Sequence, residues 1–338
     1  MTDNQIRAGI DTFTLYGEEA ASYGTKAADI NKLFGNVTAF SANPSRNLIK
    51  LRGFKGVLPA ANTTSTARDA HQILRGNFEG SGNVAFNPFN FRWMKVVLGT
   101  ESGAGTGASK YNYPQATASS DADKKKYLRI PSLTISENNR YSGTSDNVDR
   151  AFAYLGSMVN SCTINGNVGE PVSVSLDYVF GDMSTSTTLE TPVATPTNDV
   201  YHFVGTTLEI PTASAIDNIF ESFSLTITND VELLRGQGSD KAKQGIVKER
   251  NFEFSPTLTN EGVEFLKSFM GSATALAAPT EIASITLKMV SETNKNVNIV
   301  LLRCKIDNPT KSQDYPNVVK EGMTIHPQVI YVVEQTEA

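Results

Sequence analysis

The sequence predicts a mainly β protein with short helices, organised as two tandem β domains. Three observations lead to this fold class: apolar and polar residues alternate along several segments, helical spacing is confined to two short segments, and short motifs recur in the same order along the chain. The 338 residues suffice for two domains of ~150 residues each, and 39% hydrophobic residues can form their cores.

The strands are predicted from alternation with a period of two residues. In the clearest segment Val174 and Leu176 share one face, whereas Ser173, Ser175 and Asp177 share the other. The same pattern is found in the segments 132–136 and 223–228. A strand with one apolar and one polar face is typical of an antiparallel sheet that packs on a core with one side only.

One short amphipathic helix is predicted beside each set of strands. The segments 87–99 and 259–271 have apolar residues at helical spacing, and each ends in a glycine that suits a helix C-cap, Gly99 and Gly271. The single tryptophan, Trp93, lies on the apolar stripe of the first helix. We expect the apolar face of the 172–180 strand to pack against it.

Four motifs recur in order and indicate an internal duplication. The paired segments are Asn47–Gly56 with Asp230–Ser239, which share Leu-Arg-Gly; Asn77–Glu79 with Asn251–Glu253; Ile130–Ile135 with Ile282–Leu287; and the strands that contain Cys162 and Cys304. We therefore predict a first copy at 1–183, a linker rich in Thr and Pro at 184–200, and a second copy at 201–338. Two unrelated β domains are the alternative interpretation.

The first copy carries the longer insertions, at 54–68 and 101–127, which we interpret as contact loops. Their candidate contact residues are Lys55, Lys110, Tyr111, Lys124, Lys125 and Lys126. The lysine run at 124–126 is interpreted first as a solvated loop end, and an acidic partner surface is the alternative.

The sequence contains little that could support catalysis. The two cysteines exclude a disulfide scaffold and look like buried thiols, and the histidines His71, His202 and His326 are too far apart in sequence for metal-ligand spacing. The glycine-rich segment 103–107 lacks the helix that a phosphate-binding loop needs. A net charge of -5 disfavours tight DNA binding. We predict no catalytic, cofactor-binding or metal-binding residues, no enzyme activity and no membrane-spanning segment.

Three segments resemble tail tube (major tail) proteins of long-tailed bacteriophages and archaeal tailed viruses. They are the opening segment Gly9–Thr25, the strand–turn–strand unit at Met158–Gly181 with its Gly-Glu-Pro turn, and the segment Glu221–Ser239 that leads into a Gly-rich loop. The resemblance implies two tandem tail-tube-like domains of the β-sandwich or barrel-forming kind, each with a flanking amphipathic helix, whose inner sheets join those of neighbours into a continuous barrel around a channel. Six such domains close a ring in this family, so a duplicated chain would form a trimer, and an unduplicated chain a hexamer.

The resemblance also implies partners and a location. Stacked rings would form the virion tail, assembled in the host cytoplasm with tape-measure and terminator or baseplate proteins, and double-stranded DNA would pass through the tube during ejection. Ser173, Ser175 and Asp177 are the candidate lumen-facing residues. We expect the 101–127 loop to be mobile in the free subunit and ordered against the next ring. A carbohydrate-binding or adhesive β-sandwich remains the alternative, and an esterase-like hydrolase would need parallel strands and long helices.

Overall fold

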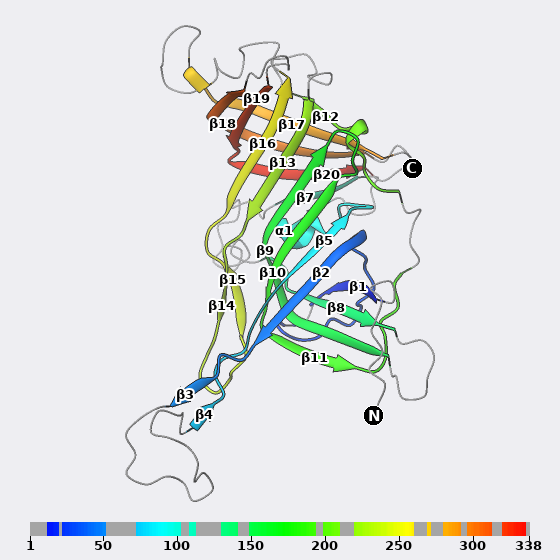
Figure 1. The fold of residues 1–338 in the computed structure, drawn as a ribbon, viewed down its shortest axis with the longest axis vertical. Helices are drawn as coiled ribbons and strands as arrows, with labels where there is room; N and C mark the ends of the chain where they lie inside the picture. The colour runs from blue at the N-terminus through cyan, green and yellow to red at the C-terminus, as the bar shows by residue number, and fades with distance from the viewer. Residues whose placement is uncertain are drawn as a thin grey trace, which may run out of the picture.

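The computed structural model describes residues 12–19, 22–51, 72–102, 108–112, 130–140, 149–193, 199–209, 220–259, 269–271, 280–291, 296–312 and 320–335. The fold is mainly β, and its strands pair antiparallel (Figure 1). The first strands are β1 (Thr12–Glu18), β2 (Asn36–Ser45), β3 (Ile49–Leu51), β4 (Gln72–Leu74), β5 (Glu79–Asn87), β6 (Thr100–Ser102), β7 (Ala108–Asn112), β8 (Leu133–Asn139), β9 (Arg150–Asn167), β10 (Ser173–Phe180) and β11 (Asp182–Ser186). The later strands are β12 (Thr207–Glu209), β13 (Phe220–Thr228), β14 (Val231–Leu234), β15 (Gln244–Val247), β16 (Asn251–Thr259), β17 (Ile282–Val290), β18 (Asn296–Ser312), β19 (Lys320–His326) and β20 (Val329–Gln335).

One sheet runs through the length of the molecule and is called the long sheet below. Its strand order is β2-β5-β10-β9-β13-β16-β19-β18, and it stays open, because β2 and β18 do not pair with each other. The described strands of the single chain therefore form no closed barrel.

Two smaller groups of strands pack on the apolar side of the long sheet. The first consists of β1, β8, β11 and the beginning of β9, and the second of β12, β17, β20 and the beginning of β18. The strands β9 and β18 therefore belong to two sheets each: the beginning of each strand pairs within a smaller group, and the rest pairs within the long sheet. They bend where Gly156 has a φ of 62° and Arg303 a φ of 54°, a left-handed conformation that interrupts the regular pleat.

The order of strand pairing in residues 12–186 recurs in residues 207–335. The first set contains the pairs β1·β8, β8·β9, β9·β11, β9·β10, β10·β5 and β5·β2. The second contains β12·β17, β17·β18, β18·β20, β18·β19, β19·β16 and β16·β13. A two-stranded arm follows the first long-sheet strand of each set, β3·β4 after β2 and β14·β15 after β13.

The structure shortens the first predicted helix and describes only the end of the second. The first is confined to α1 (Met94–Leu98), because Asn87 ends β5 and the chain reaches Trp93 through a turn. Gly99 ends it with a φ of 116° and donates its N–H to the carbonyl of Lys95, as the C-cap prediction requires. In the second segment Thr259 ends β16, residues 260–268 lie outside the described residues, and Phe269 and Met270 are helical.

Part of the predicted 101–127 loop is β structure. The strands β6 and β7 pair with each other, and β7 also pairs with β20. Residues of the first predicted copy therefore extend the sheet of the second. The 54–68 loop, Gly103–Gly107 and residues 113–127 lie outside the described residues, and in the linker segment 184–200 residues 184–186 belong to β11.

Candidate assembly site

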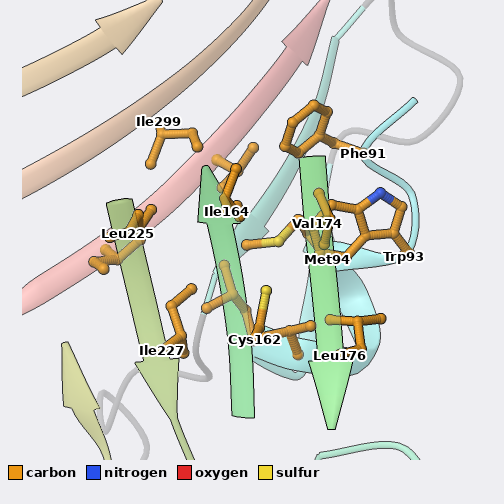
Figure 2. Packing of buried hydrophobic residues seen from close by; sticks show 14 of the residues in the cluster. Phe91, Trp93, Met94, Cys162, Ile164, Val174, Leu176, Leu225, Ile227 and Ile299 are labelled. Carbon is orange, nitrogen blue, oxygen red and sulfur yellow. The ribbon is translucent and has the colours of Figure 1, made fainter. Parts of the chain in front are cut away.

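The alternation predicted for β10 places its two faces in different environments. Val174 and Leu176 are buried, and Figure 2 shows them beside Trp93 and Met94, as expected. Ser173 and Asp177 are exposed on the other side of the strand, and Ser175 is half-buried there. The strand therefore has one face in the core and one polar face at the surface.

The polar face continues across the long sheet, because cross-strand partners share a face. Three rows of partners cross it: Asn83, Asp177, Ser161, Thr228 and Asn251; Ala85, Ser175, Thr163, Thr226 and Glu253; and Ser173, Asn165, Ser224 and Ser255. All of these residues are half-buried or exposed. The charged residues in these rows, Asp177 and Glu253, are both acidic.

Side-chain hydrogen bonds hold this polar face in place. The Asn83 amide donates to Ser175 Oγ and to Asp177 Oδ1, at 2.7 Å each, and Ser161 Oγ donates to Asp177 Oδ2 at 2.7 Å. Near one end of the sheet Lys320 Nζ lies 2.6 Å from Glu221 Oε2. Hydrogen bonds from Lys320 and then Thr259 hold the pKa of Glu221 below its ordinary value.

Both ends of the long sheet have an unpaired edge within the described residues. β2 pairs with β5 only, and residues 305–312 of β18 pair with β19 only. An unpaired strand presents a row of N–H and C=O groups that another strand can bind. The two edges therefore can accept strands from outside the chain.

The middle of the long sheet shows how such an edge is filled. Residues 161–167 of β9 pair with β13, the counterpart of β2. Of these, residues 161–165 have in the first set the position that residues 308–312 have in the second. Asn229, at the end of β13, is buried and donates its amide to the carbonyls of Val97 and Val159, at 3.1 Å each. This contact between the two sets of strands is called the internal junction below.

Residue equivalences between the two sets follow from shared irregularities. Asn47 (φ 34°) and Asp230 (φ 40°) both begin the arm that follows the first strand of a set. The pairing of β2 with β5 slips between Val37 and Ala39, and that of β13 with β16 slips between Phe220 and Ser222. Because Asn47 aligns with Asp230, Asn43 corresponds to Thr226. Because the bend of β18 at Arg303 aligns with the bend of β9 at Gly156, Thr310 corresponds to Thr163. Thr226 and Thr163 are direct partners at the internal junction.

The family was identified by a sequence comparison. A family model described as phage tail tube protein matches residues 9–260, which run from before β1 to just beyond β16. The chain belongs to the phage tail tube protein family. A search of curated proteins found no match.

A phage tail tube protein is a structural component of the virion tail that assembles into a tube, and the family is not an enzyme family. The described residues contain no group of three or more His, Cys, Asp or Glu side chains placed to hold a metal ion. No helix among them is long and apolar enough to cross a membrane.

The candidate contact residues of this tail tube protein lie in different environments. Lys110 is exposed on β7, and its Nζ lies 4.0 Å from the centre of the Tyr331 ring. Tyr111, its neighbour, is buried in the subunit, and its hydroxyl donates to Glu334 Oε2 at 3.3 Å. Lys55, Lys124, Lys125 and Lys126 lie outside the described residues. The contact role of the loops stays a prediction.

Sequence reasoning missed the buried polar groups of the tail tube protein. Glu334 is only 6% exposed and also accepts a hydrogen bond from the backbone N–H of Phe91, at 3.1 Å. Alternation along β20 indicates that Glu334 faces the core, but it does not predict a carboxylate at a buried position. The cysteines are buried free thiols, as predicted, and burial raises the pKa of Cys304 to about 12.

Proposed function

We propose that this protein polymerises as stacked rings into the viral tail tube, and that the two free edges of the long sheet close each ring. The internal junction carries the proposal, because it is a built example of the contact that β2 and β18 would make between subunits. Ring closure would remove both unpaired edges. Stacking of rings is a contact that does not close on itself, so it would extend the assembly into a tube.

The repeated order of strand pairing supports two tandem copies of one unit, with the boundary near residues 184–200. Three subunits would then supply six units and form a pseudo-sixfold ring. The pairing of β7 with β20 makes the two copies unequal, which a ring of only approximate sixfold symmetry tolerates. A homohexamer is the alternative arrangement.

The polar face would line the channel, with Ser173, Ser175 and Asp177 among the lumen-facing residues. Across β5, β10, β9, β13 and β16 its rows consist mainly of Ser, Thr and Asn with the acidic Asp177 and Glu253. On β19 and β18 the same face carries Lys320, which is paired with Glu221, and Lys305. DNA is held by cations that neutralise its phosphates, so a surface of this kind would let double-stranded DNA slide during ejection. Tape-measure and terminator or baseplate proteins would be the further partners, and assembly would occur in the host cytoplasm.

A disulfide across the proposed contact tests the ring. The internal junction places Thr226 opposite Thr163, so we expect Asn43 to lie opposite Thr310 of the next subunit. Directly opposed residues on paired strands lie about 4.5–5.5 Å apart, within disulfide reach. The variant Asn43→Cys/Thr310→Cys should cross-link under mild oxidation into a ladder that ends at three subunits on a non-reducing gel.

The matched control shifts one cysteine by two residues. Ser45→Cys/Thr310→Cys keeps both thiols on the same face but makes them diagonal neighbours, about 7–8 Å apart, and should cross-link poorly. Native Cys162 and Cys304 are buried and stay out of the reaction. Equal cross-linking of the two variants would refute the register. A ladder that ends at six would favour the homohexamer.

A carbohydrate-binding or adhesive role is the second candidate, and the structure favours it less. Such surfaces expose an aromatic platform, whereas the large exposed hydrophobic side chains in the described part of the chain are aliphatic. Electron micrographs of the purified protein separate the two functions, because rings or tubes support the first and discrete monomers the second.

A further inference from the structure

The β3·β4 arm extends away from the long sheet and carries exposed apolar side chains. Figure 1 shows it projecting from the end of β2 at the lower left. Leu48 is 58% exposed, Ile49 50%, Ile73 57% and Leu74 37%. Isolated surface aliphatics are common, but four on one small arm mark a contact surface.

The second arm, β14·β15, occurs in the same place in its own set and packs on the first set. Val231 packs against the core and donates its backbone N–H to Asn160 Oδ1 at 2.8 Å. Gly245 lies against the side chain of Met158 on β9, with no room for a Cβ. Val247 is buried. The arm thus covers the outer part of the bend in β9.

We propose that the β3·β4 arm docks on the second set of strands in a neighbouring copy of this chain, as the β14·β15 arm docks on the first set within the chain. The inference rests on the proposed ring, because β2 must pair with the neighbouring β18 to bring the arm there. Leu48 corresponds to Val231 and Ile73 corresponds to Gly245. Leu48 and Ile73 therefore lie on the docking face of the β3·β4 arm. Ile49 and Leu74 are partners on the opposite face.

The receiving surface has matching features. Lys305 corresponds to Met158, and it is exposed beside His326 on the paired strand β19. Its long alkyl stem can cover the Ile73 side chain while the ammonium group stays in water. In the internal junction Gly245 of the arm lies against the large apolar side chain of Met158 on β9. In the proposed contact Ile73 of the arm would lie against the flexible Lys305, so the large apolar side chain would belong to the arm and not to the receiving strand.

A hydrogen-bond acceptor is also retained. Asp307 corresponds to Asn160, whose side-chain oxygen accepts the N–H of Val231 in the internal junction. Asp307 is exposed, and its Oδ1 accepts the N–H of Asn308 at 2.8 Å. A carboxylate has room for further donors, so it can accept the N–H of Leu48 from the neighbouring copy.

The first test compares two adjacent residues on opposite faces of the arm. Ile73→Asp places a charge in the docking face and should weaken ring assembly by about tenfold or more, measured by sedimentation velocity over a concentration series. Leu74→Asp is the matched control and should leave ring assembly within about twofold of the unchanged chain. Both side chains are exposed, so both variants should fold, which near-ultraviolet circular dichroism of the subunit checks. Equal effects of the two substitutions would overturn the proposal.

A second test detects the contact directly. Ile73→Cys/Lys305→Cys should cross-link between subunits in assembled material and stay uncross-linked in dilute subunits. The control Leu74→Cys/Lys305→Cys should remain uncross-linked in both. If the Asn43→Cys/Thr310→Cys ladder forms but this cross-link does not, the arm inference fails while the proposed ring stands. If neither forms, the ring proposal fails.

Discussion

At the scale of single residues, buried polar groups join segments that are far apart in sequence. Glu19 accepts hydrogen bonds from the N–H groups of Gly24 and Gly156, at 2.8 and 2.7 Å. Burial raises the pKa of Glu19 despite these donors. In the neighbouring residue Glu18, Oε1 lies 2.8 Å from Lys32 Nζ and Oε2 lies 2.7 Å from Lys95 Nζ. Both carboxylates therefore tie the end of β1 to other elements.

The ion pairs of Glu18 predict a pH dependence of stability. Burial alone would raise the pKa of Glu18, but hydrogen bonds from Lys32 and Lys95 more than offset it and hold the pKa below its ordinary value. The folded state therefore binds this proton less well than the unfolded state. Its contribution to stability is present above the ordinary pKa and is lost as the pH falls through the lowered pKa.

Glu18→Gln should therefore reduce the free energy of unfolding near neutral pH, and the difference from the unchanged chain should shrink as the pH falls below about 4. Urea titrations of the free subunit at several pH values measure this. Glu232→Gln, at an exposed position of β14, is the control and should show little difference at any pH. A Glu18→Gln deficit that is constant with pH would contradict the prediction.

At the scale of elements, the alternation along a strand decides which substitutions matter. On β10 Leu176 is 1% exposed within the core cluster, whereas Ser173 on the same strand is exposed.

The bends of β9 and β18 show a limit of sequence matching. Cys162 lies beyond the bend at Gly156, and Cys304 directly follows the bend at Arg303. The two cysteine strands correspond, but the two cysteines do not.

Leu176→Ala should lower the free energy of unfolding by about 2–5 kcal/mol, because it removes buried methyl groups and leaves a cavity beside α1. Ser173→Ala, the control on the opposite face, should change it by less than about 0.5 kcal/mol. Chemical denaturation of the subunit measures both. Similar costs at the two positions would show that β10 does not have one buried and one open face.

At the scale of the whole molecule, the described strands form the internal junction between the two sets and leave unpaired the two edges that would form a second junction of this kind. The internal junction closes the edges of β9 and β13, while β2 and the outer part of β18 stay unpaired within the described residues. Assembly would therefore complete the hydrogen bonding of the long sheet.

Hydrogen exchange should locate this change. The outward-facing amides of β2 and of residues 305–312 should exchange fast in the free subunit and become at least tenfold slower on assembly, because they acquire partners. β7 is the internal comparison: it lies between β6 and β20, so its amides should be protected in both states. Rapid exchange of β7 in the free subunit would instead restore the expectation of a mobile segment there. An unchanged rate at β2 would count against ring closure.

The sequence by itself determined the mainly β class, the outward face of β10 and the buried thiols. These properties are local or periodic, so they can be read from side-chain spacing. The tertiary structure alone decided that the long sheet stays open, that β9 and β18 serve two sheets, and that β7 joins the second set. Strand partners far apart in sequence are chosen by packing and by the satisfaction of backbone hydrogen bonds across the whole molecule, and no local pattern records that choice.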